Sequence, residues 1–377
     1  MAQLEFLENG YYSLVVCPRS RDCPRTSPDN VVKLNDGSLL LPYCHKTGRA
    51  DEATEITKGK RSTDGGRTWG RSFTIFPNEA KMHCGTGGWL RLGSGELAVA
   101  FYRMEAYDNM QIYLLRSSDE GKTFGEPARI TPREGYNCPC NGRLVQLDGG
   151  RLIYPIAYTS RSRAADENYS TIVCYSDDGG ATWRESRSEL RAAKRGLMEP
   201  VIAEIADGRC LMLMRTQLGS QYQSFSDDGG ETWSAVEPSA LVCPEAGAHL
   251  ARVPNTRDLL ACWNYDYKPH WHRRHYGLRC PLTVAISRDG GRTWENIKDL
   301  EDDHRYAYMN PSIGFIDGYA YVTYARGHWI SQWGIMDAKL TIVPIDFFYN
   351  DHRLDRAFRE MPQPKAPLGI DINAQKK

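Results

Sequence analysis

The segment Ser176-Asp-Asp-Gly-Gly-Ala-Thr-Trp183 decides how this chain is organised, because four related octapeptides share its pattern Ser-x-Asp-x-Gly-x-Thr-Trp/Phe. The five copies are STDGGRTW from Ser62, SSDEGKTF from Ser117, SDDGGATW from Ser176, SDDGGETW from Ser226 and SRDGGRTW from Ser287. Their central residues are Asp64, Asp119, Asp178, Asp228 and Asp289, 50 to 61 positions apart. A repeat of this length indicates repeated supersecondary units.

Each octapeptide has the chemistry of a self-contained turn. The Asp carboxylate accepts nearby backbone N–H groups, Gly supplies positive φ, and the Thr hydroxyl and the aromatic ring close the turn. We therefore expect these octapeptides to connect outer strands and to be structural rather than catalytic.

A second repeat alternates with the first. Turn residues precede apolar runs in six segments, at 35–43, 92–103, 147–158, 206–215, 254–264 and 316–326. Each run is long enough for one buried strand, which we interpret as the inner strand of a unit. Six units of about 60 residues predict an all-β six-bladed β-propeller with four-stranded antiparallel blades.

The ends of the chain bear on how such a ring would close. Segments 10–16 and 339–349 are both strand-like, and we expect one to complete the blade begun by the other, which protects strand edges. The prediction is one domain over 1–377, with the propeller at about 10–350 and a tail at 351–377.

Composition limits the classes of function. Lys and Arg together number 47, as do Asp and Glu, and no long apolar segment occurs, so neither nucleic-acid nor membrane binding is expected. The 11 cysteines and the absence of a secretory signal predict reduced thiols and a cytoplasmic location. The pair Cys138 and Cys140 lacks further ligands at metal-binding spacing, so no metal is expected.

Charges at strand ends are the candidates for chemistry. Asp51 and Glu52 follow the first apolar run, Glu199 opens the fourth unit, Arg215 ends its strand, and Arg279 precedes another. Each could be an ordinary salt-bridge partner, but arginines that converge from two units would grip a carboxylate in a bidentate manner.

The octapeptides and the six units resemble the Asp boxes and the propeller of the sialidase (neuraminidase) superfamily, over roughly residues 20 to 345. The resemblance implies an exo-acting, retaining glycoside hydrolase for a terminal sialic acid or related acidic sugar, without a cofactor. It implies Asp51 as acid/base, Glu199 as the base that activates a tyrosine, and Tyr308 as nucleophile, with the substrate carboxylate held by Arg215 and Arg279.

The chain departs from the family pattern at two places. Arg25 lies near the position of the first arginine of the clamp, but the surrounding sequence CPRTSPDN lacks the family's Arg-Ile-Pro motif. Near Tyr308, both Tyr306 and Asn310 compete for the nucleophile position, and an asparagine there would remove the covalent route.

Alternative functions therefore stay open. One is an enzyme acting on a uronic or other acidic sugar, with His45 as acid or base, and another is a non-catalytic carbohydrate- or protein-binding propeller. A scaffold or assembly factor is a third, although it would not need an arginine clamp. The aromatic, basic segment 263–279 could form a wall of a sugar pocket or a contact between protomers, and His83 could be a pocket group.

Overall fold

The protein is all-β. The computed structural model describes residues 5–6, 12–50, 53–266, 279–328 and 335–350. Within these ranges it has strands β1 to β27 and a short 3-10 helix, η2 (Ile345–Phe348). No helix in the described part of the chain is both long and apolar enough to cross a membrane.

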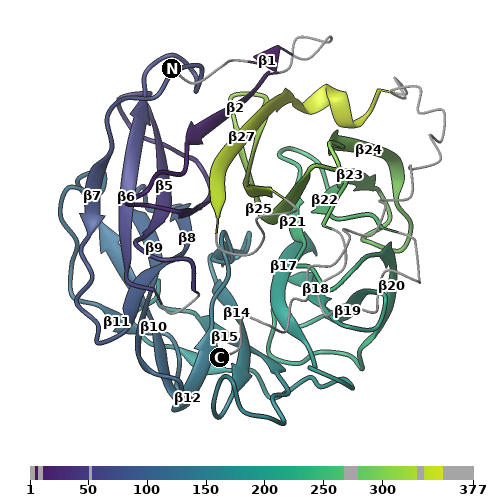
Figure 1. Ribbon diagram of the computed structural model, residues 1–377. Coiled ribbons are helices and arrows are strands. Elements are labelled where there is room, and N and C mark those ends of the chain that lie inside the picture. Colours follow the sequence, from purple (N-terminus) through teal and green to yellow (C-terminus); the bar gives the residue numbers. More distant parts are fainter. Residues whose placement is uncertain (1–4, 7–11, 51–52, 267–278, 329–334, 351–377) are drawn as a thin grey trace, which may run out of the picture.

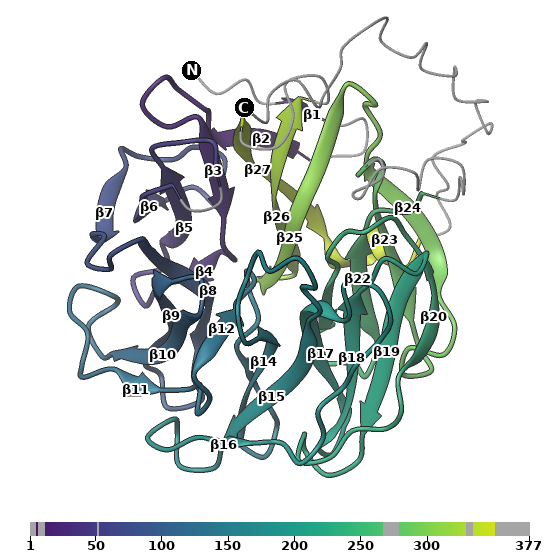
Figure 2. The ribbon, with the colours of Figure 1, turned by 60° about the horizontal axis from the view of Figure 1, so that its bottom comes forward.

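The strands form sheets of 10, 9, 4 and 4 strands around a common centre (Figures 1 and 2). A short parallel pairing lies within each of the two larger sheets, and we describe the antiparallel parts on either side of it separately, as six groups in chain order. The first comprises β3 (Arg25–Pro28), β4 (Val32–Lys33), β5 (Leu39–Lys46), β6 (Glu55–Ser62) and β7 (Phe73–Phe76). The second comprises β8 (His83–Arg91), β9 (Leu97–Ala106), β10 (Asn109–Ser117) and β11 (Ala128–Arg129). The third comprises β12 (Gly135–Cys138), β13 (Val145–Gln146), β14 (Leu152–Thr159), β15 (Ser170–Ser176) and β16 (Arg184–Glu185).

The remaining groups follow in the same order along the chain. The fourth comprises β17 (Met198–Ala206), β18 (Arg209–Arg215), β19 (Ser220–Ser226) and β20 (Glu237–Val242). The fifth comprises β21 (His249–Arg252), β22 (Leu259–Trp263), β23 (Leu282–Ser287) and β24 (Glu295–Glu301). The sixth comprises β25 (Tyr306–Ile316), β26 (Tyr319–His328), β27 (Met336–Pro344), β2 (Tyr12–Cys17) and β1 (Glu5–Phe6).

The sixth group joins distant parts of the chain. Strand β27 pairs antiparallel with β2, with Ile342 opposite Tyr12, so a strand near the start completes the group begun near the end. A short parallel pairing, Met336 with Arg25, links β27 to β3 of the first group. The expected completion of one terminal strand by the other is therefore confirmed.

The apolar runs that the sequence suggested as inner strands are the second strands of their groups. Here β3 with β4, and β12 with β13, are each counted as one interrupted first strand, because both members pair with the same following strand. The apolar runs correspond to β5, β9, β14, β18, β22 and β26. First strands β3, β8, β12, β17 and β25 precede them and carry cavity-lining residues, and the ends of β5, β9, β14 and β18 add others. The second strand is the more continuously apolar because it packs against both neighbouring groups: Leu152 of β14 lies in a buried cluster with the second group, and Ile153 lies in a cluster with the fourth. The first strands are interrupted by Gly and polar residues, which weakened their signal.

The five octapeptides form the expected turns, and they begin at the last residues of β6, β10, β15, β19 and β23 in the first five groups. In the first, the Ser62 hydroxyl and the backbone N–H of Thr68 donate to Asp64 Oδ1 at 2.8 and 2.9 Å, and the Thr68 hydroxyl donates to Oδ2 at 2.6 Å. The other four copies repeat this arrangement. In the second copy, these bonds lower the pKa of Asp119 to about 2.

Candidate functional site

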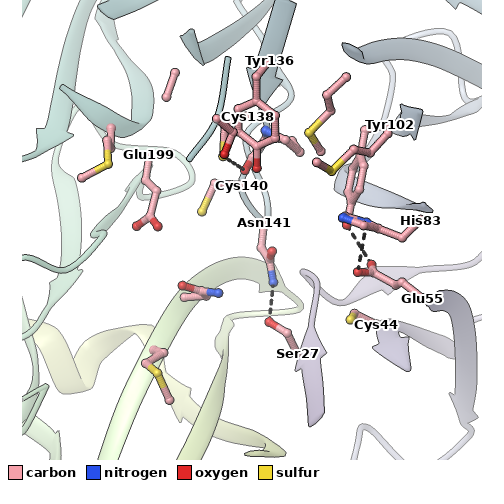
Figure 3. Close-up of a pocket in the computed structure, with 18 of the residues that line it drawn as sticks. Ser27, Cys44, Glu55, His83, Tyr102, Tyr136, Cys138, Cys140, Asn141 and Glu199 are labelled. Carbon is pink, nitrogen blue, oxygen red and sulfur yellow. Dashed lines mark hydrogen bonds and ion pairs between the residues drawn. The ribbon is translucent and has the colours of Figure 1, made fainter. Parts of the chain in front are cut away.

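A cavity of about 760 Å³ opens where the first strands of the groups converge. Its walls include residues of β3 and β8, of β12 and β17, and of β25. Figure 3 shows Glu199 on one side of this cavity, and Glu55, His83 and Tyr102 on the other, with Asn141 between them.

Among the described residues that line the cavity, basic side chains outnumber acidic ones. The basic residues are Arg25, Lys46, Arg49, Arg163, Arg195, Arg215 and Arg279, and the acidic residues are Asp29, Glu55, Glu167 and Glu199. A concave, partly buried surface with this excess of positive charge favours an anionic ligand.

Glu199 and Arg215 form the centre of the first wall, the wall on the Glu199 side. Glu199 lies at a bulge of β17 with φ of 44°, a conformation that non-glycine residues rarely adopt and that is often found at functional sites. Arg215 donates to Glu199 Oε1 at 2.6 Å. Although burial raises the pKa of Glu199, the charges of Arg215, Arg279 and Arg143 lower it by more, so this carboxylate stays ionised.

Glu245 lies behind these residues and contacts three arginines. Its Oε1 accepts hydrogen bonds from Arg195 at 2.8 Å and from Arg215 at 3.0 Å, and its backbone carbonyl accepts one from Arg279 at 3.0 Å. Gln217 donates to its Oε2 at 2.9 Å. Sequence reasoning missed Glu245, because it lies in a loop without a recognisable motif.

The second wall has its own cluster of ionisable groups. Lys46 lies 3.1 Å from Glu55 Oε2, the Tyr102 hydroxyl donates to Glu55 Oε1 at 2.8 Å, and His83 lies beside them. Burial raises the pKa of Glu55, but Lys46, His83 and Tyr102 together lower it below its usual range. Glu55 was also missed, although a charged residue at the start of a strand run was the available signal.

Asp29 lies at the cavity close to Asn141. Its Oδ1 accepts the backbone N–H groups of Asn30 at 2.9 Å and Gly142 at 3.0 Å. Its other oxygen is buried and has no hydrogen-bond partner. Burial raises the pKa of Asp29 to about 6.

Several of the expected site residues meet at this cavity. Glu199, Arg215, Arg279 and Arg25 all line it, and the guanidinium of Arg25 donates to the backbone carbonyl of Arg49 at 3.3 Å. Asp51 lies outside the described residues, as does most of segment 263–279. His45 does not line the cavity, because alternation along β5 directs Cys44 and Lys46 there instead, whereas His83 does line it.

The structure does not bring Tyr308 to the cavity. Its side chain is fully buried in the apolar cluster between the fifth and sixth groups, its ring packs against Tyr324, and its hydroxyl donates weakly to the Asp303 carbonyl at 3.4 Å. Asn310 lines the cavity instead, at a bulge of β25 with φ of 51°. The bulge breaks the alternation that would have put both side chains on one face.

Cysteine and methionine side chains form a large part of the remaining lining. The sulfur-containing residues are Cys44, Cys138, Cys140, Met104, Met110, Met198, Met309 and Met336. Within the described ranges no three His, Cys, Asp or Glu side chains gather as a metal site would require, and burial raises the pKa of the Cys138 thiol to about 12. The expected absence of a metal thus remains an expectation.

Comparisons with known proteins identify similar sequences and similar folds. A family model described as "BNR repeat-like domain" matches residues 60–323. A sialidase of Bacteroides fragilis is 26% identical over 320 residues, covering 74% of this chain and 56% of that protein. A sialidase of Clostridium perfringens is 24% identical over 239 residues, covering 55% of this chain and 60% of that protein. The chain thus spans 56 to 60% of the length of these two curated relatives.

Solved structures show a similar fold. A Dyadobacter fermentans protein of unknown function superposes with a TM-score of 0.67 at 20% identity, covering 88% of this chain and 97% of that one. The NanB sialidase of Streptococcus pneumoniae superposes with a TM-score of 0.69 at 12% identity, covering 91% and 72%. Since the family model matches well over half of the residues, the chain belongs to the BNR repeat-like domain family, within the sialidase superfamily.

Proposed function

We propose that this protein is an exo-acting glycoside hydrolase that removes a terminal sialic acid or related acidic sugar from a glycoconjugate. The six strand groups then correspond to the blades of a single six-bladed β-propeller, with the cavity at its centre. The observation that carries the proposal is the convergence of Glu199, Arg215 and Arg279 on one wall of a cavity with excess positive charge.

In this proposal, Arg215 and Arg279 bind the carboxylate of the sugar, and Arg25 is part of the lining of the same cavity. Guanidinium groups suit this role because they remain charged and donate in a planar fork. The substrate carboxylate would compete with Glu199 and Glu245 for the N–H groups of the arginines. Both arginines are already buried and bonded to oxygen atoms of the protein, so binding an anion does not require a further loss of their hydration.

The position of Asn310 changes the expected chemistry. An amide is not a suitable nucleophile, and the Tyr308 hydroxyl is enclosed in the core. We therefore propose that water attacks the anomeric carbon and transfers its proton to Glu199, while the bond to the leaving oxygen breaks. The leaving oxygen receives a proton from an acid, the role that the family resemblance implies for Asp51. A single displacement inverts the configuration, in contrast to the retention expected from the sequence.

Hydrolysis of fluorogenic glycosides tests the function. The wild-type protein is assayed with an aryl glycoside of N-acetylneuraminic acid and with an aryl glucuronide, beside Glu199→Gln and Glu204→Gln. Glu204 is a suitable control because it is a buried, Arg-paired carboxylate on the same strand, β17, outside the cavity lining. We expect loss of a general base to lower kcat by about 10²-fold or more, with no such loss in the control.

The products distinguish the alternatives. NMR of the first-formed sugar anomer reports inversion or retention. Turnover of the glucuronide alone would favour a uronic acid as the substrate, an alternative supported by the absence of a tyrosine at position 310. Binding of either sugar without turnover would favour a carbohydrate-binding module, and full activity of Glu199→Gln would refute the proposed catalytic role.

A further inference from the structure

Glu245 contacts three arginines of the wall on the Glu199 side of the cavity, which we call the basic wall: Arg195, Arg215 and Arg279. It follows β20 in the short loop that leads to β21, and its side chain is 3% exposed. One of its oxygens, Oε1, lies between Arg195 at 2.8 Å and Arg215 at 3.0 Å. These two arginines come from different segments, one before β17 and one at the end of β18. Each also has a partner of its own, Glu167 for Arg195 and Glu199 for Arg215, and Glu245 is the partner that they share.

The same loop holds the remaining members of the wall. The backbone carbonyl of Glu245 accepts a hydrogen bond from Arg279 at 3.0 Å. Two residues further on, Gly247 leaves room for Glu199, because a Cβ on Gly247 would lie 2.1 Å from Glu199 Oε2. The loop thus contacts Glu199 and all three arginines, although Glu245 itself is absent from the cavity lining.

The side chain of Glu245 is itself held in place. Gln217 donates to Oε2 at 2.9 Å, so both oxygens are engaged. Burying a carboxylate costs free energy because it loses its hydration, and bonds to two guanidinium groups and a further donor offset this cost. The same bonds hold each partner in one geometry. Long arginine side chains otherwise lose considerable rotamer entropy when they become ordered on a ligand.

We propose that Glu245 is a positioning residue that pre-organises Arg195, Arg215 and Arg279 for binding a carboxylate-bearing sugar. The inference rests on the proposed function, whose site it completes. It assigns to Arg195, rather than to Arg25, the place beside Arg215 in the basic wall, since Arg195 and Arg215 share Glu245 while Arg25 bonds to the Arg49 carbonyl.

Charge and geometry predict opposite effects when Glu245 is replaced. Removing its negative charge makes the wall more positive, which by electrostatics alone would strengthen anion binding. Removing its contacts releases the arginines, which would weaken binding. Glu245→Gln and Glu245→Ala change the charge equally, but only glutamine keeps an acceptor oxygen of similar reach, so comparing the two variants separates charge from position.

The experiment measures dissociation constants by calorimetry for N-acetylneuraminic acid, its uncharged methyl ester and glucuronic acid. For the acid that the wild-type protein binds, we expect affinity to decrease from wild type to Glu245→Gln to Glu245→Ala, by about tenfold or more in the last. The preference for N-acetylneuraminic acid over its ester should also decrease, whereas a merely structural role would weaken both ligands equally. Glu204→Gln, which makes the same charge change away from the cavity, should bind as wild type does.

Each outcome decides the inference. Equal or tighter binding of the acid by both variants, or an unchanged acid-to-ester preference, would overturn it. If Glu245→Ala does not fold, Glu245→Gln decides alone. If the wild-type protein binds neither acid, the proposed function fails, and the crystal structures of wild type and variant test Glu245 separately. If the guanidinium groups of Arg195 and Arg215 have the same positions in the variant as in the wild type, the positioning role is overturned. If they are displaced, it is supported.

Discussion

Gly247→Ala tests how closely the loop that holds Glu245 approaches Glu199. The added Cβ would lie 2.1 Å from Oε2, 3.2 Å from Cδ and 3.4 Å from Cβ of Glu199, whereas Cβ contacts under 3.0 Å are essentially never observed. Glu199 is in turn held by Arg215 at 2.6 Å. The carboxylate must therefore move by about 1 Å, or the loop must move away from it.

The expected cost follows from these two possibilities. Overpacking a rigid site costs about 1–3 kcal/mol, and loss of the charge-assisted bond between Glu199 and Arg215 costs a similar amount. We expect the free energy of unfolding to fall by about 1–3 kcal/mol. We also expect acidic-sugar binding or turnover to fall by at least tenfold, because a displacement of this size removes the geometry on which the carboxylate acts.

Urea denaturation and the glycoside assay measure the two effects. The matched control is Gly149→Ala, because a Cβ there would meet no atom within 4 Å. It should be neutral or more stable by about 0.4–1 kcal/mol, since alanine restricts the unfolded chain. If Gly247→Ala unfolds at the same urea concentration as the wild type and keeps its ligand affinity, the close approach of this loop to Glu199 is refuted.

Three further predictions concern residues outside that loop. Tyr308→Phe should leave turnover within about twofold of wild type and cost less than about 1 kcal/mol, because only a weak bond to the Asp303 carbonyl is lost; a large fall in kcat would contradict its placement in the core. Asp228→Ala should lower the free energy of unfolding by about 1–2 kcal/mol with unchanged ligand affinity, because its turn is remote from the cavity, and altered affinity would argue against a purely structural turn. His249→Gln should reduce acid sensitivity, since burial, with Arg143, lowers the pKa of folded His249 to about 3 while the unfolded value is about 6.5. The unfolded state alone then takes up a proton below pH 6.5, so the wild type should lose about 2–3 kcal/mol between pH 7 and 4.5 that the variant keeps, and identical pH profiles in urea denaturation would exclude this linkage.

The repeats predicted the regular part of the fold because they satisfy their own hydrogen bonds. Each octapeptide encodes its turn locally, and the apolar runs that became β9, β14 and β18 are continuous enough to be recognised. The first strands were harder to place, since their glycine and polar residues serve contacts with distant segments. Gly87 in β8 is an example, because any side chain there would meet the Tyr154 hydroxyl.

The candidate site was predictable only where strand geometry is regular. Arg215 ends a regular strand, so its arrival at the cavity followed from the pattern. Asn310 and Glu199 occupy bulges with positive φ, and such conformations cannot be deduced from alternation. The family resemblance that implied Tyr308 as nucleophile therefore gave no sign that its side chain lies in the core. Glu245 and Glu55 are recognisable only through partners that lie far from them in sequence, or on another strand.

The pairing of β2 with β27 has a consequence for biosynthesis. Tyr12 is synthesised about 330 residues before its pairing partner Ile342, so β2 cannot pair with β27 until then. Until β27 is synthesised, one edge of β2 stays available to bind other extended polypeptides, and the sixth group cannot be completed before residues 336–344 have left the ribosome. Nascent chains stalled before β27 should therefore depend on chaperones, and a short peptide with the β27 sequence should capture them.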